Sequence, residues 1–258
     1  MCSLDESEIS RTILSAYHER LLDRIVSDVL IVGAGPAGMM AAIHLARKDL
    51  QVTVLEKRLS PGGGVWGGGM GMNVAVVQAE AAAVLEELEI QYTPARAGLY
   101  AVDAIELAAG LCFRAKRAGV ALFNLVTAED LCVHEGRVTG VVANRTGIVG
   151  ALPVDPITFS ARAVLDATGH EAFLVQSLRQ RRLLSDAGAA GFPGEGPMDA
   201  SAGERFVVER VAEVFPGLWI AGMSVAATLG GPRMGPIFGG MLLSGQRAAE
   251  RIESALES

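Results

Sequence analysis

The chain has 258 residues, of which 50% are hydrophobic and 20% are charged, a composition that excludes a disordered or fibrous protein and permits a full hydrophobic core. Its formal net charge is −7, and no Lys/Arg run is present, so nucleic acid is not an expected partner. Gly, Pro or a charge interrupts every apolar run before it reaches about 18 residues, which argues against a membrane span.

The N-terminal region predicts a lead-in helix. Residues 7–25 carry apolar side chains at helical spacing, and Ser3 with Glu6 resembles a capping box before them. Residues 1–27 precede the first strand, so we expect this helix to serve packing or contact between subunits. The N-terminus lacks a basic start and an apolar core, and three scattered cysteines form no disulfide framework, so we expect a cytoplasmic protein.

The segment from Asp28 to Glu56 has the order strand, helix, strand. Residues 29–32 form a continuous apolar run typical of a buried parallel strand, residues 36–48 favour a helix, and residues 51–55 favour a second strand. This order predicts a parallel α/β sheet.

The remaining chain continues this pattern. Asp103 and Glu106 form a capping pair for a helix that should end at Gly119. Two short apolar runs flank Glu135-Gly136-Arg137 and predict an antiparallel hairpin. Other expected elements are helices at 79–88 and 239–255, strands at 120–125, 163–166 and 218–221, and hairpin strands at 131–133 and 138–143. We therefore predict one α/β domain over residues 1–258, a Rossmann-like doubly wound sheet with an inserted antiparallel β-hairpin.

The turn Gly33-Ala34-Gly35-Pro36-Ala37-Gly38 predicts an adenine-dinucleotide site. In such a turn the first glycine permits the tight bend, the second admits the pyrophosphate, and the third lets the helix pack on the strand. Glu56 follows the second strand, where a carboxylate can accept hydrogen bonds from the ribose hydroxyls, which favours NAD or FAD over NADP. The turn alone does not distinguish NAD from FAD.

From Asp28 onward the sequence resembles the thiamine thiazole synthase family. Beyond the dinucleotide turn and Glu56-Lys57, the matching segments are Pro61–Trp66, Phe123-Asn124, Glu129–Leu131, Val154–Pro156, Asp166–His170 and Gly230–Pro236. The last three together are specific to this family, whereas the dinucleotide turn is shared with many flavoproteins.

The resemblance implies a reaction rather than hydride transfer. NAD would lose nicotinamide, the ADP-ribose would isomerise to a ketone and condense with glycine, and sulfur addition with ring closure would give an ADP-thiazole carboxylate. The resemblance also implies a Rossmann-type fold, a homo-octamer with active sites shared between subunits, and dependence on Fe(II).

The resemblance further assigns individual residues. Asp155 and His170 correspond to iron ligands from neighbouring subunits, and a carboxylate with an imidazole suits Fe(II). Without the resemblance, a turn at Asp155-Pro156 and a buried, hydrogen-bonded imidazole at His170 are favoured over metal binding, because two ligands alone do not define a site. Arg233 would hold the glycine carboxylate, its alternative being a surface ion pair. The residues implied around the nucleotide are Gly33, Ala34, Gly35, Gly38, Glu56, Lys57, Gly64, Val126, Asp155 and Met223. For Val126 and Met223, core packing is an equal alternative.

Pro153 occupies the position where eukaryotic relatives carry a sacrificial cysteine and many archaeal relatives carry histidine. Proline supplies no sulfur, and Cys112 and Cys132 fit buried, inert thiols, so we expect a multiple-turnover enzyme that uses inorganic sulfide. If the family histidine moves protons, water or another group must replace it. His44 and His134 stand in no matching motif, and we expect them to be structural and solvent-facing, respectively.

Three other functions fit parts of the sequence. A flavin-dependent oxidoreductase is favoured by the dinucleotide turn and by residues 218–222, which occur in FAD enzymes. A nucleotide-binding protein that has lost catalysis is suggested by Pro153. An isomerase of a phosphorylated sugar would perform the ketose-forming step alone.

Overall fold

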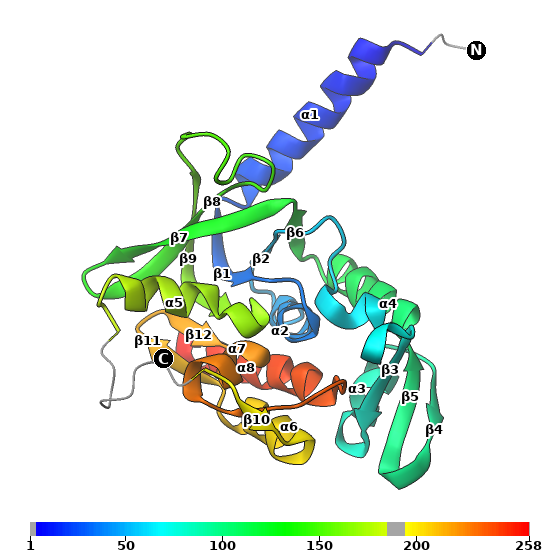
Figure 1. Cartoon of the computed structure of the whole chain (residues 1–258). Coiled ribbons are helices and arrows are strands. Elements are labelled where there is room, and N and C mark those ends of the chain that lie inside the picture. Colours follow the sequence, from blue (N-terminus) through cyan, green and yellow to red (C-terminus); the bar gives the residue numbers. More distant parts are fainter. Residues whose placement is uncertain (1–3, 185–193, 258) are drawn as a thin grey trace.

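The structure is a computed structural model and describes residues 4–184 and 194–257. Its main sheet contains eight strands: the hairpin of β7 and β8 joins it through β9, and the other six strands follow the order β11-β12-β9-β1-β2-β6 (Figure 1). These strands are β1 (Val26–Val32), β2 (Val52–Glu56), β6 (Ala121–Asn124), β9 (Ile157–Asp166), β11 (Ala212–Phe215) and β12 (Leu218–Ile220). The pairs joining β12, β9, β1, β2 and β6 are parallel, which confirms the predicted α/β class.

The predicted hairpin is present and is longer than its apolar cores suggested. It consists of β7 (Val126–His134) and β8 (Arg137–Arg145), and β8 pairs antiparallel with the first half of β9. Glu135 and Gly136 form the connection with φ of 51° and 75°, as a two-residue hairpin turn with positive φ at both positions requires. The hairpin is thus an extension of the main sheet.

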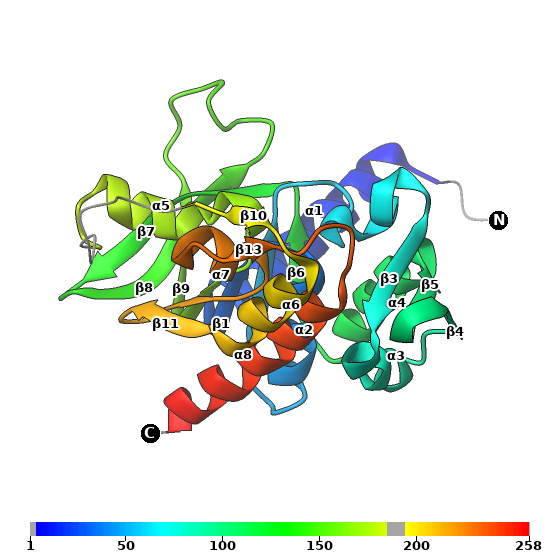
Figure 2. The same ribbon diagram turned by 60° about the horizontal axis from the view of Figure 1, so that its bottom comes forward.

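Two helices pack on neighbouring strands of the main sheet (Figures 1 and 2). Helix α2 (Pro36–Ala46) lies on β1 and β2, and α8 (Gly239–Glu257) lies on β9 and β12. The two helices approach closely, because a Cβ on Gly245 would stand 2.2 Å from the carbonyl oxygen of Ala37. Both helices were predicted, and α8 continues two residues beyond the predicted end.

A small antiparallel sheet beside the main one was not predicted. Its strands are β3 (Val74–Gln78), β5 (Leu99–Asp103) and β4 (Tyr92–Pro94), in the order β3-β5-β4. Between β3 and β4, the helix expected at 79–88 is a 3-10 turn, η3 (Ala79–Ala81), followed by α3 (Ala82–Glu87). These strands were missed because β4 has only three residues and Gly-rich sequence precedes β3.

Helix α4 (Ala104–Arg117) confirms one half of its predicted cap. The Asp103 carboxylate accepts hydrogen bonds from the backbone N–H groups of Ile105 and Glu106. The reciprocal half is wrong, because the Glu106 carboxylate accepts from the backbone N–H of Gln91 at 2.8 Å. Glu106 therefore ties α4 to the residue before β4.

Helix α1 (Glu6–Asp23) projects away from the main sheet (Figure 1). Asp5 caps it through the N–H of Ser7, so it starts later than the proposed capping box, whose Ser3 lies outside the described residues. Packing within the chain is confirmed only for Tyr17 and Leu21, which contact the core. Three other residues of the predicted apolar stripe, Ile9, Ile13 and Leu14, are exposed.

Other elements complete the described chain. They are η1 (Gly63–Gly67), η2 (Gly69–Gly71), η4 (Arg96–Gly98), η5 (Gly169–Glu171), α5 (Phe173–Gln180), α6 (Ala200–Glu209), α7 (Met223–Leu229), β10 (Gly196–Met198) and β13 (Pro232–Arg233). Strands β10 and β13 pair in parallel. Within residues 4–184 and 194–257, no helix has the length and apolar character needed to cross a membrane.

Candidate functional site

A cavity of about 830 Å³ lies at the carboxyl ends of the parallel strands. Its wall includes Gly33, Glu56, Ala167 and Ala221, which stand at or just after the ends of β1, β2, β9 and β12. Open α/β sheets bind their ligands at this edge, and the volume is large enough for a nucleotide-sized molecule. The main sheet thus presents one candidate site where the dinucleotide turn predicted it.

The three glycines of the turn meet the three expected requirements. Gly33 has a φ of 102°, and a Cβ there would lie 2.3 Å from the carbonyl oxygen of Ala167. A Cβ on Gly38 would lie 2.1 Å from the carbonyl oxygen of Gly33. Gly35 lines the cavity, and a Cβ there would meet no atom within 4 Å. Gly33 and Gly38 therefore permit close packing, while Gly35 leaves open space before the N-terminus of α2, where an anion is favoured.

Glu56 is held at the cavity wall by backbone hydrogen bonds. Its side chain is only 6% exposed, and its two oxygens accept from the N–H groups of Ala34 (2.8 Å) and Arg58 (2.7 Å). An ionised carboxylate has about four acceptor positions, so Glu56 retains capacity for ligand hydroxyls. Ala34 is fully buried and does not line the cavity. Its observed role is to fix Glu56 through its N–H.

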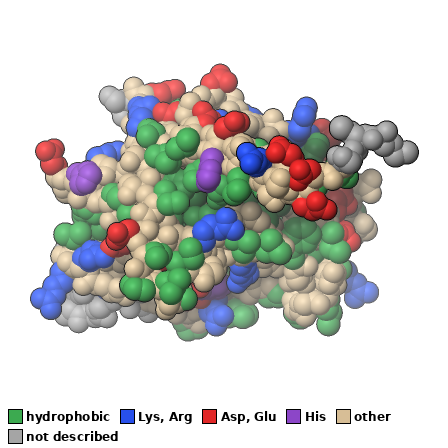
Figure 3. Space-filling model, turned by 90° about the horizontal axis from the view of Figure 1, so that it is seen from above, with side chains coloured by type: hydrophobic (Ala, Val, Ile, Leu, Met, Phe, Trp, Pro, Cys, Tyr) green, Lys and Arg blue, Asp and Glu red, His purple; other side chains and the backbone are tan. Residues whose placement is uncertain are grey.

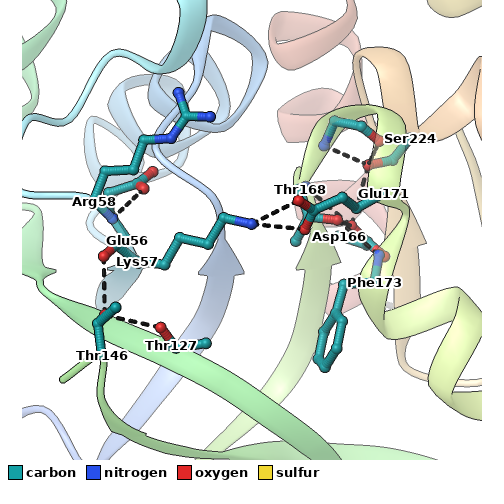
Figure 4. A network of polar contacts seen from close by, with 11 residues as sticks. Glu56, Lys57, Arg58, Thr127, Thr146, Asp166, Thr168, Glu171, Phe173 and Ser224 are labelled. Carbon is teal, nitrogen blue, oxygen red and sulfur yellow. Dashed lines mark hydrogen bonds and ion pairs between the residues drawn. The ribbon is translucent and has the colours of Figure 1, made fainter. Parts of the chain in front are cut away.

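Lys57 reaches from the end of β2 toward η5 (Figure 4). Its Nζ lies 2.7 Å from each carboxylate oxygen of Glu171, and both residues line the cavity. Gly64, Val126 and Met223 line it as well. Core packing alone therefore does not describe Val126 and Met223, although nucleotide binding by these residues remains a prediction.

A buried carboxylate orients the loop that follows β9. Asp166 is fully buried, which raises its pKa, whereas hydrogen bonds from the backbone and hydroxyl of Thr168 and from the Ser224 hydroxyl lower that pKa (Figure 4). Asp166 also accepts from the N–H groups of Leu174 (2.8 Å) and Val175 (3.2 Å) in the first turn of α5. These bonds fix η5, which carries His170, between β9 and α5.

His170 and Arg233 both line the cavity and share one partner. Nδ1 of His170 forms a hydrogen bond with Oε1 of Glu195, and Nε of Arg233 lies 3.3 Å from Oε2 of the same carboxylate. The His170 side chain is 62% exposed, so the alternative of a buried imidazole is wrong. Arg233 forms an ion pair, as the alternative expected, and it also lines the cavity, so its contact with glycine stays a prediction.

Glu195 was missed by sequence reasoning. It stands in the Gly/Pro-rich run Pro193-Gly194-Glu195-Gly196-Pro197, which matches no catalytic pattern, and it is 25 residues from His170 and 38 from Arg233. An acid within such a run is the only local signal, and that signal also fits an ordinary turn. Only the folded chain brings the three side chains together.

Asp155 lies apart from this cluster. It is exposed in the loop between β8 and β9, next to the exposed Pro153, and it does not line the cavity. Across the described parts of the chain, no group of three or more His, Cys, Asp or Glu side chains could hold a metal ion. The two predicted iron ligands have suitable donor types, a carboxylate and an imidazole, but Asp155 does not line the cavity that His170 lines.

Among the described residues, Cys112, Cys132, His44 and His134 lie outside the cavity wall. Burial raises the pKa of the Cys112 and Cys132 thiols, which fits the predicted inert thiols. His44 lies on α2 with Nε2 3.3 Å from a Glu87 oxygen, a structural position. His134 is exposed at the end of β7, as predicted.

Comparison with known proteins places the chain in a family. The Thi4 family model matches residues 10–238. A protein of Pyrococcus abyssi named thiamine thiazole synthase is 49% identical over 96% of this chain and 97% of its own length. A protein of the same name from Thermotoga maritima is 46% identical over 98% of this chain and 99% of its own. The crystal structure of Thermovibrio ammonificans THI4 superposes with a TM-score of 0.92 and 42% identity, over 99% of this chain and all of that one. The chain therefore belongs to the Thi4 family.

Proposed function

We propose that the chain is a cytoplasmic enzyme of thiazole biosynthesis. It converts NAD, glycine and sulfide to an ADP-thiazole carboxylate with release of nicotinamide, so its first step is a pentosyl transfer from NAD. The observation that carries this proposal is a single cavity whose wall joins the dinucleotide turn and Glu56 to His170 and Arg233. The family membership and the name shared by the Pyrococcus and Thermotoga relatives support the same reaction.

The cavity supports NAD as the substrate. The open space at Gly35 suits a pyrophosphate at the start of α2, because backbone N–H groups there lack helical partners. The fixed carboxylate of Glu56 can accept hydrogen bonds from ribose hydroxyls, and its charge would repel a 2′-phosphate. Lys57 adds a cation on the same side of the cavity. These features bind the ADP-ribose portion and leave the reacting end near η5.

Arg233 supports glycine as the second substrate. Its Nε is engaged by Glu195, while the guanidinium has further N–H donors on its two terminal nitrogens. Such a pair of donors can hold a carboxylate through two parallel hydrogen bonds. The cavity also includes Met198, Met234 and Phe238, whose apolar surface would exclude water from the condensing groups.

The proposal includes Fe(II) held between subunits. His170 would supply an imidazole nitrogen and Asp155 of a neighbouring chain a carboxylate, and the metal would supply Lewis-acid chemistry to the condensing groups. Support comes from the position of Asp155, which is exposed on a projecting loop and outside its own chain's cavity. We propose a homo-octamer, in which exposed apolar residues of α1 would be covered. Hydrophobic side chains also gather on the face seen in Figure 3.

We propose inorganic sulfide as the sulfur source and multiple turnover as the consequence. Pro153 carries no sulfur, and neither Cys112 nor Cys132 lines the cavity. Burial raises the pKa of both thiols, which disfavours the reactive thiolate form. No cysteine sulfur among the described residues therefore lines the cavity.

The test is an anaerobic incubation of the purified chain with NAD, glycine, Fe(II) and sulfide. We expect nicotinamide release and a product with the mass of an ADP-thiazole carboxylate, with product exceeding protein on a molar basis. NAD binding without nicotinamide release would show a family member without catalysis, and intact FAD released on denaturation would show a flavoenzyme. Formation of a ketose, with no thiazole product when glycine and sulfide are both supplied, would support the isomerase instead.

A further inference from the structure

Glu195 is the only acid that contacts both His170 and Arg233 within the described chain. Its side chain is 13% exposed, whereas those of His170 and Arg233 are 62% and 56% exposed. A carboxylate with so little access to water requires partners for its charge, and both partners are residues of the candidate site. Glu195 thus lies behind the two exposed groups and contacts each through a different oxygen.

Backbone pairing fixes Glu195 relative to Arg233. The N–H of Gly196 donates to the carbonyl oxygen of Gly231 at 2.8 Å, and the N–H of Asp199 donates to the carbonyl oxygen of Arg233 at 3.0 Å. These bonds belong to the pairing of β10 with β13. Glu195 directly precedes β10, so the pairing of β10 with β13 fixes the backbone of Glu195 relative to that of Arg233.

The contact with His170 selects the state of the imidazole. A carboxylate accepts hydrogen bonds and, when ionised, cannot donate one, so Nδ1 of His170 must carry the proton. In the neutral ring Nε2 then holds the lone pair and becomes the nitrogen that can act as a ligand or acceptor. In many metal sites a carboxylate accepts a hydrogen bond from the second ring nitrogen of a histidine ligand and so fixes its tautomer.

The contact with Arg233 selects the orientation of the guanidinium. Because Glu195 engages Nε, rotation of the planar group about its side chain is restricted. The terminal nitrogens remain as donors for a second carboxylate. One acid therefore constrains both side chains on which the proposed function depends.

We propose that Glu195 is a positioning residue, which acts through His170 and Arg233 by holding the proton of the neutral imidazole on Nδ1 and by keeping the guanidinium turned toward the cavity. This inference rests on the proposed function for its catalytic meaning. The geometry that supports it does not depend on a bound metal or nucleotide.

The first test measures the tautomer of His170 in the metal-free protein by nitrogen NMR, at a pH where an ordinary histidine is neutral. The chain has four histidines, and loss of one signal in His170→Ala assigns the resonance. We expect an Nδ1–H ring in the wild type and in Glu195→Gln, which retains an acceptor oxygen. Glu195→Ala should shift the ring toward Nε2–H. An unchanged tautomer in Glu195→Ala overturns the proposal.

The second test separates binding of glycine from binding of NAD. We expect both Glu195→Gln and Glu195→Ala to raise the KM for glycine about tenfold, because each removes the carboxylate that forms an ion pair with Arg233. NAD affinity should change less than about twofold, since Glu195 does not line the cavity. In an Arg233→Ala background, Glu195→Gln should no longer change the KM for glycine. A lower KM in Glu195→Gln would instead mean that Glu195 competes with the substrate carboxylate, and it overturns the proposal.

Glu209→Gln is the matched control. Glu209 is exposed on α6 and outside the cavity wall, so its substitution should leave the tautomer and both substrate constants unchanged. The NMR result is independent of turnover. If the wild type releases no nicotinamide, the proposed function fails, while the His170 tautomer still decides whether Glu195 has the proposed effect.

Discussion

The dinucleotide turn and the His170–Glu195–Arg233 cluster form opposite kinds of site within one cavity. The turn lies in one continuous unit, β1-α2-β2, and every contact that shapes it involves a glycine, Glu56 or the adjoining strand end. The cluster joins three separate segments of the chain, and its central acid, Glu195, belongs to no motif. A locally encoded site should be sensitive to backbone change, whereas an assembled site should be sensitive to loss of single side chains.

Gly33→Ala should have the largest effect. Its Cβ would lie 2.3 Å from the carbonyl oxygen of Ala167 at a φ of 102°, so β1 and β9 must separate. We expect destabilisation of about 3 kcal/mol or more, from left-handed backbone strain together with overpacking, and loss of nucleotide binding. Chemical denaturation and NAD titration measure the two effects.

Gly35→Ala is the paired control for the turn. Its Cβ would meet no atom within 4 Å, so stability should change by less than about 1 kcal/mol while nucleotide affinity falls. Equal stability losses in the two variants would contradict the distinction between packing and open space.

Asp155→Ala should show the opposite balance, a loss of function without a loss of fold. Asp155 is exposed and outside the cavity of its own chain, so its removal should change stability by no more than about 0.5 kcal/mol. If a neighbouring chain needs this carboxylate, product formation should disappear while NAD binding persists. Mixing Asp155→Ala with His170→Ala chains should then restore part of the activity, because mixed oligomers contain some intact pairs of ligands. No recovery after verified subunit exchange would argue against a shared site.

The same contrast explains what the sequence could predict. The β1-α2-β2 unit, the hairpin and α8 follow from periodicity and turn chemistry over short distances, and all were found near their predicted bounds. Glu195 could not be predicted as a site residue, because its contacts are with His170 and Arg233, which are 25 and 38 residues away in the sequence. The exposure of α1 in one chain was left open by the sequence, since an apolar stripe specifies that a face is buried but not which chain buries it.

Glu204 offers a pH test of such a long-range contact. It is buried between α6 and α8, its Oε2 accepts from the Gly240 N–H, and burial raises its pKa from 4.5 to about 7. The folded chain therefore binds this proton more tightly than the unfolded chain. Stability from this group is fully present below about pH 4.5 and is lost as the pH rises through about 7, by about 3 kcal/mol in total.

Glu204→Gln should abolish that pH dependence, because the amide does not titrate. Denaturation midpoints between pH 5 and pH 8, compared for the wild type and the variant, measure the difference. Parallel pH profiles for the two proteins would show that Glu204 is ionised throughout.

The smallest expected effect concerns Lys57 and Glu171, which join the two kinds of site across the cavity (Figure 4). Both side chains are about half exposed, so their ion pair should contribute less than about 1 kcal/mol to stability. Substitution of Lys57 and substitution of Glu171 should change the affinity for NAD in opposite directions. Lys57→Gln removes a cation from the phosphate side of the cavity and should weaken NAD binding by about two- to fivefold.

Glu171→Gln removes the carboxylate that pairs with Lys57 and should strengthen NAD binding by a similar factor. In the variant, the Lys57 ammonium does not have to break an ion pair before it contacts the nucleotide. The double variant should bind NAD as Lys57→Gln alone does, since without the Lys57 ammonium the loss of the Glu171 carboxylate frees no cation. Calorimetric titration of the three variants at two salt concentrations tests this, and both differences should shrink at the higher one. If Glu171→Gln weakens binding instead, Glu171 contacts the nucleotide directly and the pair is part of the ligand site rather than its competitor.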